Sequence, residues 1–233
     1  MPLLRLGPSA AAKEKRLAAL LAGRDAVDLA LPQAVEDAQV VGSLELAGET
    51  AELDEVRAAR RGEAPVSAAA GLLTALRAVE RDSPLTVEAL GAWHRALGLE
   101  AGYRAHARSR ASGPAPAPPE FIASRLAILQ DWLGVESSRE LKPAQAGALA
   151  MARLLEIVPF ERGNGRVARL AASHLMVRAG ARPPILVGTD APRIEACLTA
   201  AFQLATEPLT SLLEEASERA LDVMIRVLAD RAP

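Results

Sequence analysis

Apolar residues recur at helical spacing along most of this chain. Between Thr86 and Gly98, the residues Leu90, Trp93 and Leu97 fall on one face of a helix. Thr86 is a suitable N-cap for that helix and Gly98 a suitable C-terminal stop. Patterns of the same kind predict further helices over residues 10–22, 32–46, 50–65, 66–83, 120–134, 142–158, 166–180, 190–205 and 207–230.

Two segments interrupt this helical pattern. Gly42 and Ser43 are expected to break or bend the helix that contains them. Residues 100–120 lack a helical period and hold four prolines between positions 114 and 119, which predicts an extended loop. The alternating residues of YRAHARSRA, 103–111, favour a short β-hairpin arm. The prediction is an all-α protein with one irregular arm.

Composition supports helices and argues against several classes of function. Half of the residues are apolar but only 3% are aromatic, and alanine dominates, which favours closely packed helices over a sheet. The formal net charge of −2 gives no general attraction to nucleic acid or to an anionic membrane. No apolar run approaches the ~20 residues that span a bilayer. The single cysteine, Cys197, is predicted to be a core residue, and a cytoplasmic protein is expected.

The segment VPFERGNGRVAR has the character of an anion-binding loop. Gly163, Asn164 and Gly165 tolerate a left-handed backbone, so the turn can direct successive N–H groups towards one point. A helix predicted to start near Arg166 adds the partial positive charge of its N-terminus. Arg166 and Arg169 are three residues apart, so both guanidinium groups can reach one phosphate. A plain corner between two helices, with solvated arginines, is the alternative.

This segment resembles the motif of the Fic (fido) family of nucleotidyl transferases, His-x-Phe-x-(Asp/Glu)-Gly-Asn-Gly-Arg-x-x-Arg. Flanking segments within residues 40–195 are similar to family segments as well. The resemblance implies an all-α Fic-type fold with a small β-hairpin flap. It also implies a helical N-terminal region over residues 1–64 and a Fic-like core over residues 65–233. The matching motif residues are Phe160, Gly163, Asn164, Gly165, Arg166 and Arg169.

The resemblance also implies a ligand and a place for a partner. Gly102, Tyr103 and Arg104 resemble the entry to the family's target-binding flap, so a protein target is expected to bind there. Arg104, Arg108 and Arg110 either contact the acidic edge of such a target or a nucleotide, or form a solvated basic loop. The implied ligand is ATP or another nucleotide, with no cofactor certain and the oligomeric state left open.

The motif departs from the family pattern at two positions that carry chemistry. Val158 stands where the family has the histidine that takes a proton from the target hydroxyl. Arg162 stands where the family has the acidic residue that holds a metal ion, so Mg²⁺ is not expected. Glu161 is adjacent but is at a position that points elsewhere in the family. The general base and the metal ligand are therefore both missing.

A third departure concerns the inhibitory helix of the family, whose motif is Ser/Thr-x-x-x-Glu-Gly/Asn. The matching residues are Ser43, Ala47 and Gly48, with alanine in place of the inhibitory glutamate. Glu45 and Glu49 are two residues away and would face away from the site on a continuous helix. The sequence thus predicts loss of the inhibitor together with the base and the metal ligand.

The histidines offer little replacement for the missing base at Val158. His174 follows the motif helix and is predicted to pack in the interior. His94 shares a helix with Trp93 and is predicted to lie at the edge of the core. His106 is in the flap, which is the one element able to bring a base over the site.

These observations lead to three hypotheses. The first is an inactive relative of the transferases that binds a nucleotide or phosphate through the loop. The second is a metal-independent transferase that uses Arg162, Arg166 and Arg169 as a cradle of fixed positive charge. The third is a protein-interaction module without a ligand, docking through the flap by strand addition.

Overall fold

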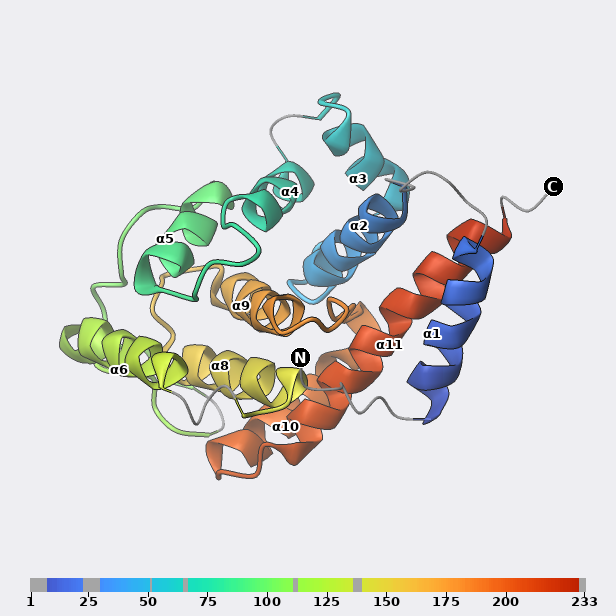
Figure 1. Cartoon of the computed structure of the whole chain (residues 1–233). Helices are drawn as coiled ribbons and strands as arrows, with labels where there is room; N and C mark the ends of the chain where they lie inside the picture. The colour runs from blue at the N-terminus through green and yellow to red at the C-terminus, as the bar shows by residue number, and fades with distance from the viewer. Residues whose placement is uncertain are drawn as a thin grey trace.

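The computed structural model describes residues 8–22, 30–50, 52–64, 67–110, 113–135 and 140–230. Within these ranges all regular secondary structure is helical, which confirms the all-α prediction (Figure 1). The helices are α1 (Pro8–Leu21), α2 (Ala30–Glu45), α3 (Leu53–Arg60), α4 (Ala68–Arg77), α5 (Val87–Ala96), η1 (Pro119–Phe121), α6 (Ile122–Gly134), α8 (Pro143–Ile157), α9 (Asn164–Arg178), η2 (Gly188–Asp190), α10 (Ala191–Phe202) and α11 (Glu207–Ala229).

The helices α8 and α9 form the centre of the molecule and pack closely on each other (Figure 1). Small residues permit this approach, since Ala148, Ala168 and Ala171 are fully buried. A Cβ atom added to Gly147 would lie 3.2 Å from the carbonyl oxygen of Ala172. The alanine-rich composition thus becomes a tight helix pair, around which the larger side chains of the other helices complete one core.

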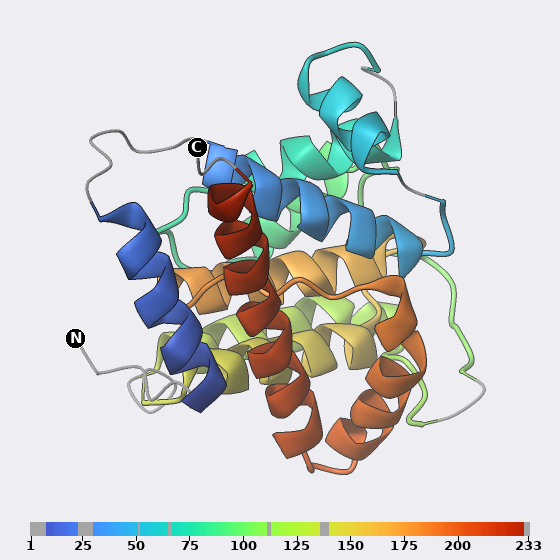
Figure 2. The ribbon, with the colours of Figure 1, turned by 90° about the vertical axis from the view of Figure 1, so that its right-hand side faces the viewer.

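The long helix α11 crosses the core helices and carries α1 along its C-terminal half (Figure 2). Leu17 of α1 packs with Leu221 and Leu228 of α11 in a small separate cluster. Lys13 lies 2.8 Å from Glu218 and 2.7 Å from Asp222, which pairs the two helices at the edge of this contact.

The predicted break at Gly42 and Ser43 is wrong, because α2 continues through both residues to Glu45. Gly42 instead lets the backbone of Leu186 approach α2 closely. A Cβ atom at position 42 would lie only 1.8 Å from the carbonyl oxygen of Leu186. Gly42 therefore allows the segment after α9 to rest directly against α2, which holds α2 beside the start of the motif helix.

The predicted β-hairpin arm is absent: residues 103–110 form no strand, and Ala111 lies outside the described residues. The backbone of this arm bonds to the motif loop rather than to itself. The Arg104 N–H donates to the Pro159 carbonyl at 3.0 Å, and the Ala105 N–H donates to Glu161 Oε1 at 3.3 Å. Because these N–H donors bond to the loop, residues 103–110 run along it without pairing with each other, and we call this segment the strap.

The remaining features of the fold follow the sequence. Thr86 caps α5, with its hydroxyl accepting from the Ala89 N–H at 3.1 Å. Cys197 is buried in α10, and burial raises the pKa of its thiol. None of the helices in the described ranges combines the length and apolarity needed to cross a membrane.

Candidate phosphate-binding site at the start of α9

The loop between α8 and α9 is set by two residues in the left-handed region. Val158 ends α8 with φ 52° and ψ 64°, and Gly163 precedes α9 with φ 79°. Asn164 closes the loop: Phe160 N–H donates to Asn164 Oδ1 at 2.9 Å, and Asn164 Nδ2 donates to the Phe160 carbonyl at 2.8 Å. The Asn164 side chain therefore shapes the loop from within.

His94 of α5 packs against this loop. Its ring stacks on Phe160 with centroids 3.9 Å apart and planes at 9°. His94 Nε2 lies 3.1 Å from the Arg162 carbonyl, which can only accept, so Nε2 carries the proton. Burial lowers the pKa of His94 and keeps the ring neutral. Gly163 completes the packing, since a Cβ atom there would lie 2.3 Å from Leu99 Cδ1. His94 is expected at the edge of the core, and the structure places it in the interior against the motif loop.

Backbone donors are open at the start of α9. The first helical hydrogen bond within this turn joins Val167 N–H to the Gly163 carbonyl at 3.0 Å. The Gly165 N–H donates to no described residue, as expected for the first turn of a helix. A Cβ atom at Gly165 would lie 3.1 Å from Arg169 Nη1, so a guanidinium group and a free N–H lie close together.

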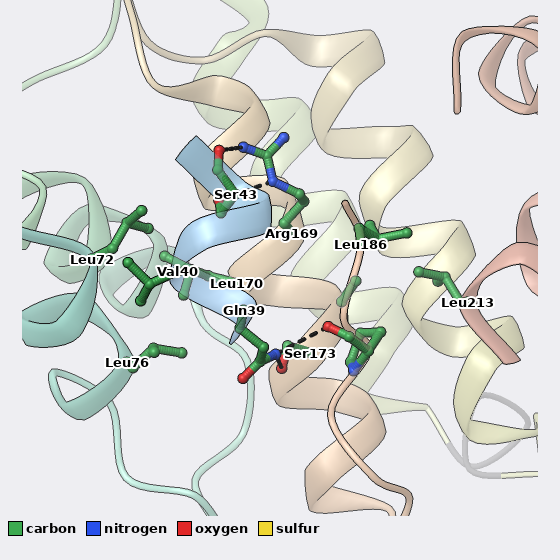
Figure 3. A pocket seen from close by; sticks show the side chains of 12 residues that line it. Gln39, Val40, Ser43, Leu72, Leu76, Arg169, Leu170, Ser173, Leu186 and Leu213 are labelled. Atoms are coloured by element: carbon green, nitrogen blue, oxygen red, sulfur yellow. Dashed lines mark hydrogen bonds between the residues drawn. The ribbon is translucent and has the colours of Figure 1, made fainter. Parts of the chain in front are cut away.

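Arg169 is a half-buried charge without a carboxylate partner among the described residues. Its Nε donates to Ser43 Oγ at 3.0 Å and its Nη2 donates to the Ser43 carbonyl at 2.8 Å (Figure 3). Burial, reinforced by the neighbouring charge of Arg166, lowers the pKa of Arg169 to about 10. Neutral oxygens therefore hold a guanidinium group whose charge is not neutralised nearby.

Arg166 does have a carboxylate partner, and this partner is Glu49. After α2 ends, Gly48 adopts φ 78° and the Glu49 N–H donates back to the Leu44 carbonyl at 3.1 Å. This turn reverses the chain and directs Glu49 towards α9. The expectation that Glu49 faces away is therefore wrong, because it assumed a helix that continues past Glu45. Burial lowers the pKa of Arg166.

The two substituted positions of the motif give no site for a divalent cation. Arg162 is exposed and forms no ion pair with a described residue. Glu161 is directed to the arm, where its Oε2 lies 3.0 Å from Arg108 Nη2. No cluster of three or more His, Cys, Asp or Glu side chains able to hold a metal exists in the described part of the chain. These residues do not fit the Mg²⁺ ion of active family members.

Arg104 and Arg110 of the arm make contacts inside the protein, whereas Arg108 is exposed and pairs with Glu161. Arg104 is only 2% exposed, and it donates to the carbonyls of Val158 at 2.7 Å and Ile157 at 3.3 Å. It thereby satisfies the orphan carbonyls at the end of α8. Arg110 lies 4.7 Å above the ring of Phe202. The arm is thus not the solvated basic loop that its composition suggests.

The other predicted residues of this region lie nearer the surface. Tyr103 is 41% exposed and its ring centre lies 6.1 Å from that of Phe160, so it marks the edge of the site. Gly102 precedes it with φ 101°. His106 is exposed and contributes its backbone carbonyl to Arg104 rather than its ring to the site. His174 packs edge-on to Trp93, as predicted.

Sequence reasoning missed the functions of Glu49, Arg104 and the pair His94–Phe160. A glycine directly before Glu49 was the available signal, because Gly48 marks a helix stop after which the chain reverses. No signal in the sequence separates the buried Arg104 from its exposed neighbours, since burial depends on the carbonyls at the end of a distant helix.

The fold and the α8–α9 loop can now be compared with those of known proteins. Residues 84–176 match the sequence model of the Fic/DOC family, so the resemblance to the Fic family is confirmed for this segment. Among curated proteins, a protein adenylyltransferase fic-1 of Caenorhabditis briggsae is 41% identical over 30% of this chain. A protein adenylyltransferase Fic of Drosophila willistoni is 31% identical over 51% of this chain. The matched regions cover 14% and 24% of those two relatives.

Solved structures agree on the fold over nearly the whole chain. Fic-1 of C. elegans superposes with a TM-score of 0.77 at 21% identity, covering 96% of this chain and 73% of that one. A Fic domain containing signaling protein from Bacteroides thetaiotaomicron gives the same TM-score at 18% identity and is covered to 98%. A structure of IbpAFic2 covalently tethered to Cdc42 also superposes, with a TM-score of 0.55.

Proposed function

We propose that this chain binds a phosphate-bearing ligand, with adenine nucleotides as the first candidates, at the start of α9 and does not transfer AMP. The observation that carries the proposal is the half-buried guanidinium of Arg169, which has no carboxylate partner among the described residues. Withdrawing a charge from water without neutralising it costs free energy. An anion beside Arg169 would remove that penalty, and the free N–H of Gly165 lies next to it.

The ligand must compete with a carboxylate of the protein itself. Glu49 pairs with Arg166 in the ligand-free chain, so its oxygens stand where a phosphate oxygen would bind. Binding then requires Glu49 to leave, which lowers the apparent affinity. Glu49→Gln should therefore strengthen binding, because the neutral amide pairs less tightly with the guanidinium.

The absence of transfer follows from side-chain chemistry. Val158 has no lone pair with which to accept the proton of a target hydroxyl, and loss of a general base lowers rates by roughly 10²–10⁴-fold. Arg162 adds positive charge where a metal ligand would need negative charge. The class of ligand is suggested by the relatives, which are named protein adenylyltransferases. A protein target, if bound, would approach at the strap near Tyr103, as Fic proteins can engage protein partners such as Cdc42.

A thermal-shift titration tests the proposal. Wild type, Arg169→Ala and Glu49→Gln would be titrated with AMP, ADP, ATP and inorganic phosphate, with and without Mg²⁺. A ligand at 100 times its Kd stabilises the fold by about 2.7 kcal/mol, which is measurable. The expected result is a shift that disappears in Arg169→Ala, is larger in Glu49→Gln at the same concentration, and does not need Mg²⁺.

A matched control is Arg125→Ala, because Arg125 is an exposed arginine of α6 without a described partner. It should bind like wild type. No shift with any of the four ligands, in wild type and in Glu49→Gln alike, would contradict ligand binding. Incorporation of labelled AMP into protein by wild type without metal would instead support a transferase that uses the arginine cradle.

A further inference from the structure

A second cavity lies on the same helix as the motif but further along it. Its volume is about 420 Å³, within the range of small-molecule sites, and it opens where α2, the end of α4 and α9 meet. A much smaller cavity, of about 30 Å³, lies beside Arg169. Gln39 and Ser173 line both cavities, and Figure 3 shows them among the residues of the smaller one.

The large cavity presents acceptor atoms without partners. Gln39 Nε2 donates to Ser173 Oγ at 3.0 Å and to the Pro184 carbonyl at 3.1 Å, which fixes the orientation of the amide. Its Oε1 atom makes no hydrogen bond to a described residue. His174 Nε2 lies 2.8 Å from the Ser83 carbonyl and must donate, so Nδ1 keeps a lone pair. Gln39 Oε1 and His174 Nδ1 can therefore each accept a hydrogen bond from a ligand.

The mouth of the cavity carries one cation that is not neutralised within the described chain. Arg81 is exposed and forms no ion pair with a described residue. The other charged residues of the lining are already paired, since Glu36 binds Arg60 at 2.9 Å and Arg182 binds Glu14 at 2.9 Å. The mouth thus favours an anionic group.

Apolar side chains form the space between the acceptors and Arg81. Val35 of α2, Leu76 of α4, Leu170 of α9 and Met224 of α11 line it. We propose that this cavity binds a small molecule with an apolar ring, a hydroxyl or N–H donor at its inner end and a carboxylate at its outer end. The donor would bond to Gln39 and His174, and the carboxylate would pair with Arg81. This site is separate from the phosphate site and does not depend on it.

Trp93 lines the cavity and provides a direct reporter. The chain contains two tryptophans, so Trp132→Phe leaves Trp93 as the sole tryptophan, which can be excited selectively near the red edge of its absorption. In that background, fluorescence would be titrated with 4-hydroxybenzoate, benzoate and phenol. We expect saturable quenching by 4-hydroxybenzoate with a Kd in the millimolar range. Benzoate lacks the donor and phenol lacks the carboxylate, so each should bind roughly fivefold more weakly.

Two variants separate specific binding from general quenching. His174→Gln keeps a donor for the Ser83 carbonyl but removes the ring acceptor, and it should bind 4-hydroxybenzoate no better than wild type binds benzoate. Arg81→Gln changes an exposed residue, and it should make 4-hydroxybenzoate and phenol bind equally. Arg166→Ala should leave the titration unchanged. Absence of saturation up to about 10 mM, or equal affinity of all three compounds, would overturn the assignment.

Discussion

Ser43 bonds to Arg169 twice, through its hydroxyl oxygen at 3.0 Å and its backbone carbonyl at 2.8 Å. This pair ties the end of α2 to the first turns of α9 and holds a guanidinium group away from water. Ser43→Ala should remove the side-chain bond and destabilise the protein by about 1–3 kcal/mol, the range for a hydrogen bond to a charged group. Urea denaturation measures the change.

Ser124→Ala is the matched control for Ser43→Ala. Ser124 is exposed on α6, and its hydroxyl donates to the neutral Phe121 carbonyl at 3.0 Å. Its effect should stay within about 0.5 kcal/mol. Equal effects of the two changes would show that the Ser43–Arg169 pair has no special energetic role.

The conformation of Val158 predicts a stabilising substitution. A β-branched residue at φ 52° is strained by roughly 1–2 kcal/mol, whereas asparagine tolerates this region. Val158→Asn should therefore raise the free energy of unfolding by about 1 kcal/mol, while Val158→Ala should not, because alanine retains the same backbone penalty.

Leu204 offers an internal comparison for this effect. It has φ 69° and is 85% exposed, far from the motif in sequence. Leu204→Asn should stabilise by a similar amount without any effect on ligand binding. If Leu204→Asn stabilises and Val158→Asn does not, packing of the valine outweighs the backbone strain.

Restoring the two missing groups predicts a gain of activity. Val158→His with Arg162→Asp would supply a general base and a carboxylate for Mg²⁺ in a loop whose backbone is already formed. Incorporation of labelled AMP into the protein or an added target should appear in the double variant, with each single variant slower by roughly 10² or more. Glu49→Gln in the same background should increase it. No incorporation with or without Glu49→Gln would mean that other parts of the catalytic arrangement are lost.

The buried histidines predict a dependence of stability on pH. Burial lowers the pKa of His94 and of His174 below the ordinary 6.5. Between each lowered value and 6.5 the unfolded chain binds more protons, so the free energy of unfolding falls as the pH falls through this window. Urea midpoints at pH 7.5 and pH 5.5 should therefore differ less in His94→Gln than in wild type. An unchanged difference would contradict a neutral His94 in the fold.

The helices were predictable because each depends on local spacing, and the exceptions show where local information ends. Gly42 predicts a break in its helix, but the contact that explains this glycine comes from Leu186, which lies far along the chain. The prediction of a hairpin arm is wrong for a similar reason. Its alternating pattern is real, but its donors bond to the motif loop, which the pattern cannot reveal.

The backbone turn of the site could be predicted from the sequence, whereas the side-chain partners of its arginines could not. Gly163 and Asn164 have the turn-forming functions that their residue types indicate. The start of α9 was placed near Arg166 and lies at Asn164, within the ordinary uncertainty of helix ends. The pairing of Arg166 with Glu49 required a chain reversal after α2, and a register argument that assumes a continuous helix excludes it.

The seam between α2 and α9 arranges its polar contacts one helical turn apart. Ser43 meets Arg169, and one turn along each helix Gln39 meets Ser173. The two cavities therefore lie side by side along α9, and Gln39 and Ser173 border both of them. One side-chain pair thus forms a wall that the two cavities share, so a substitution at either residue would reshape both.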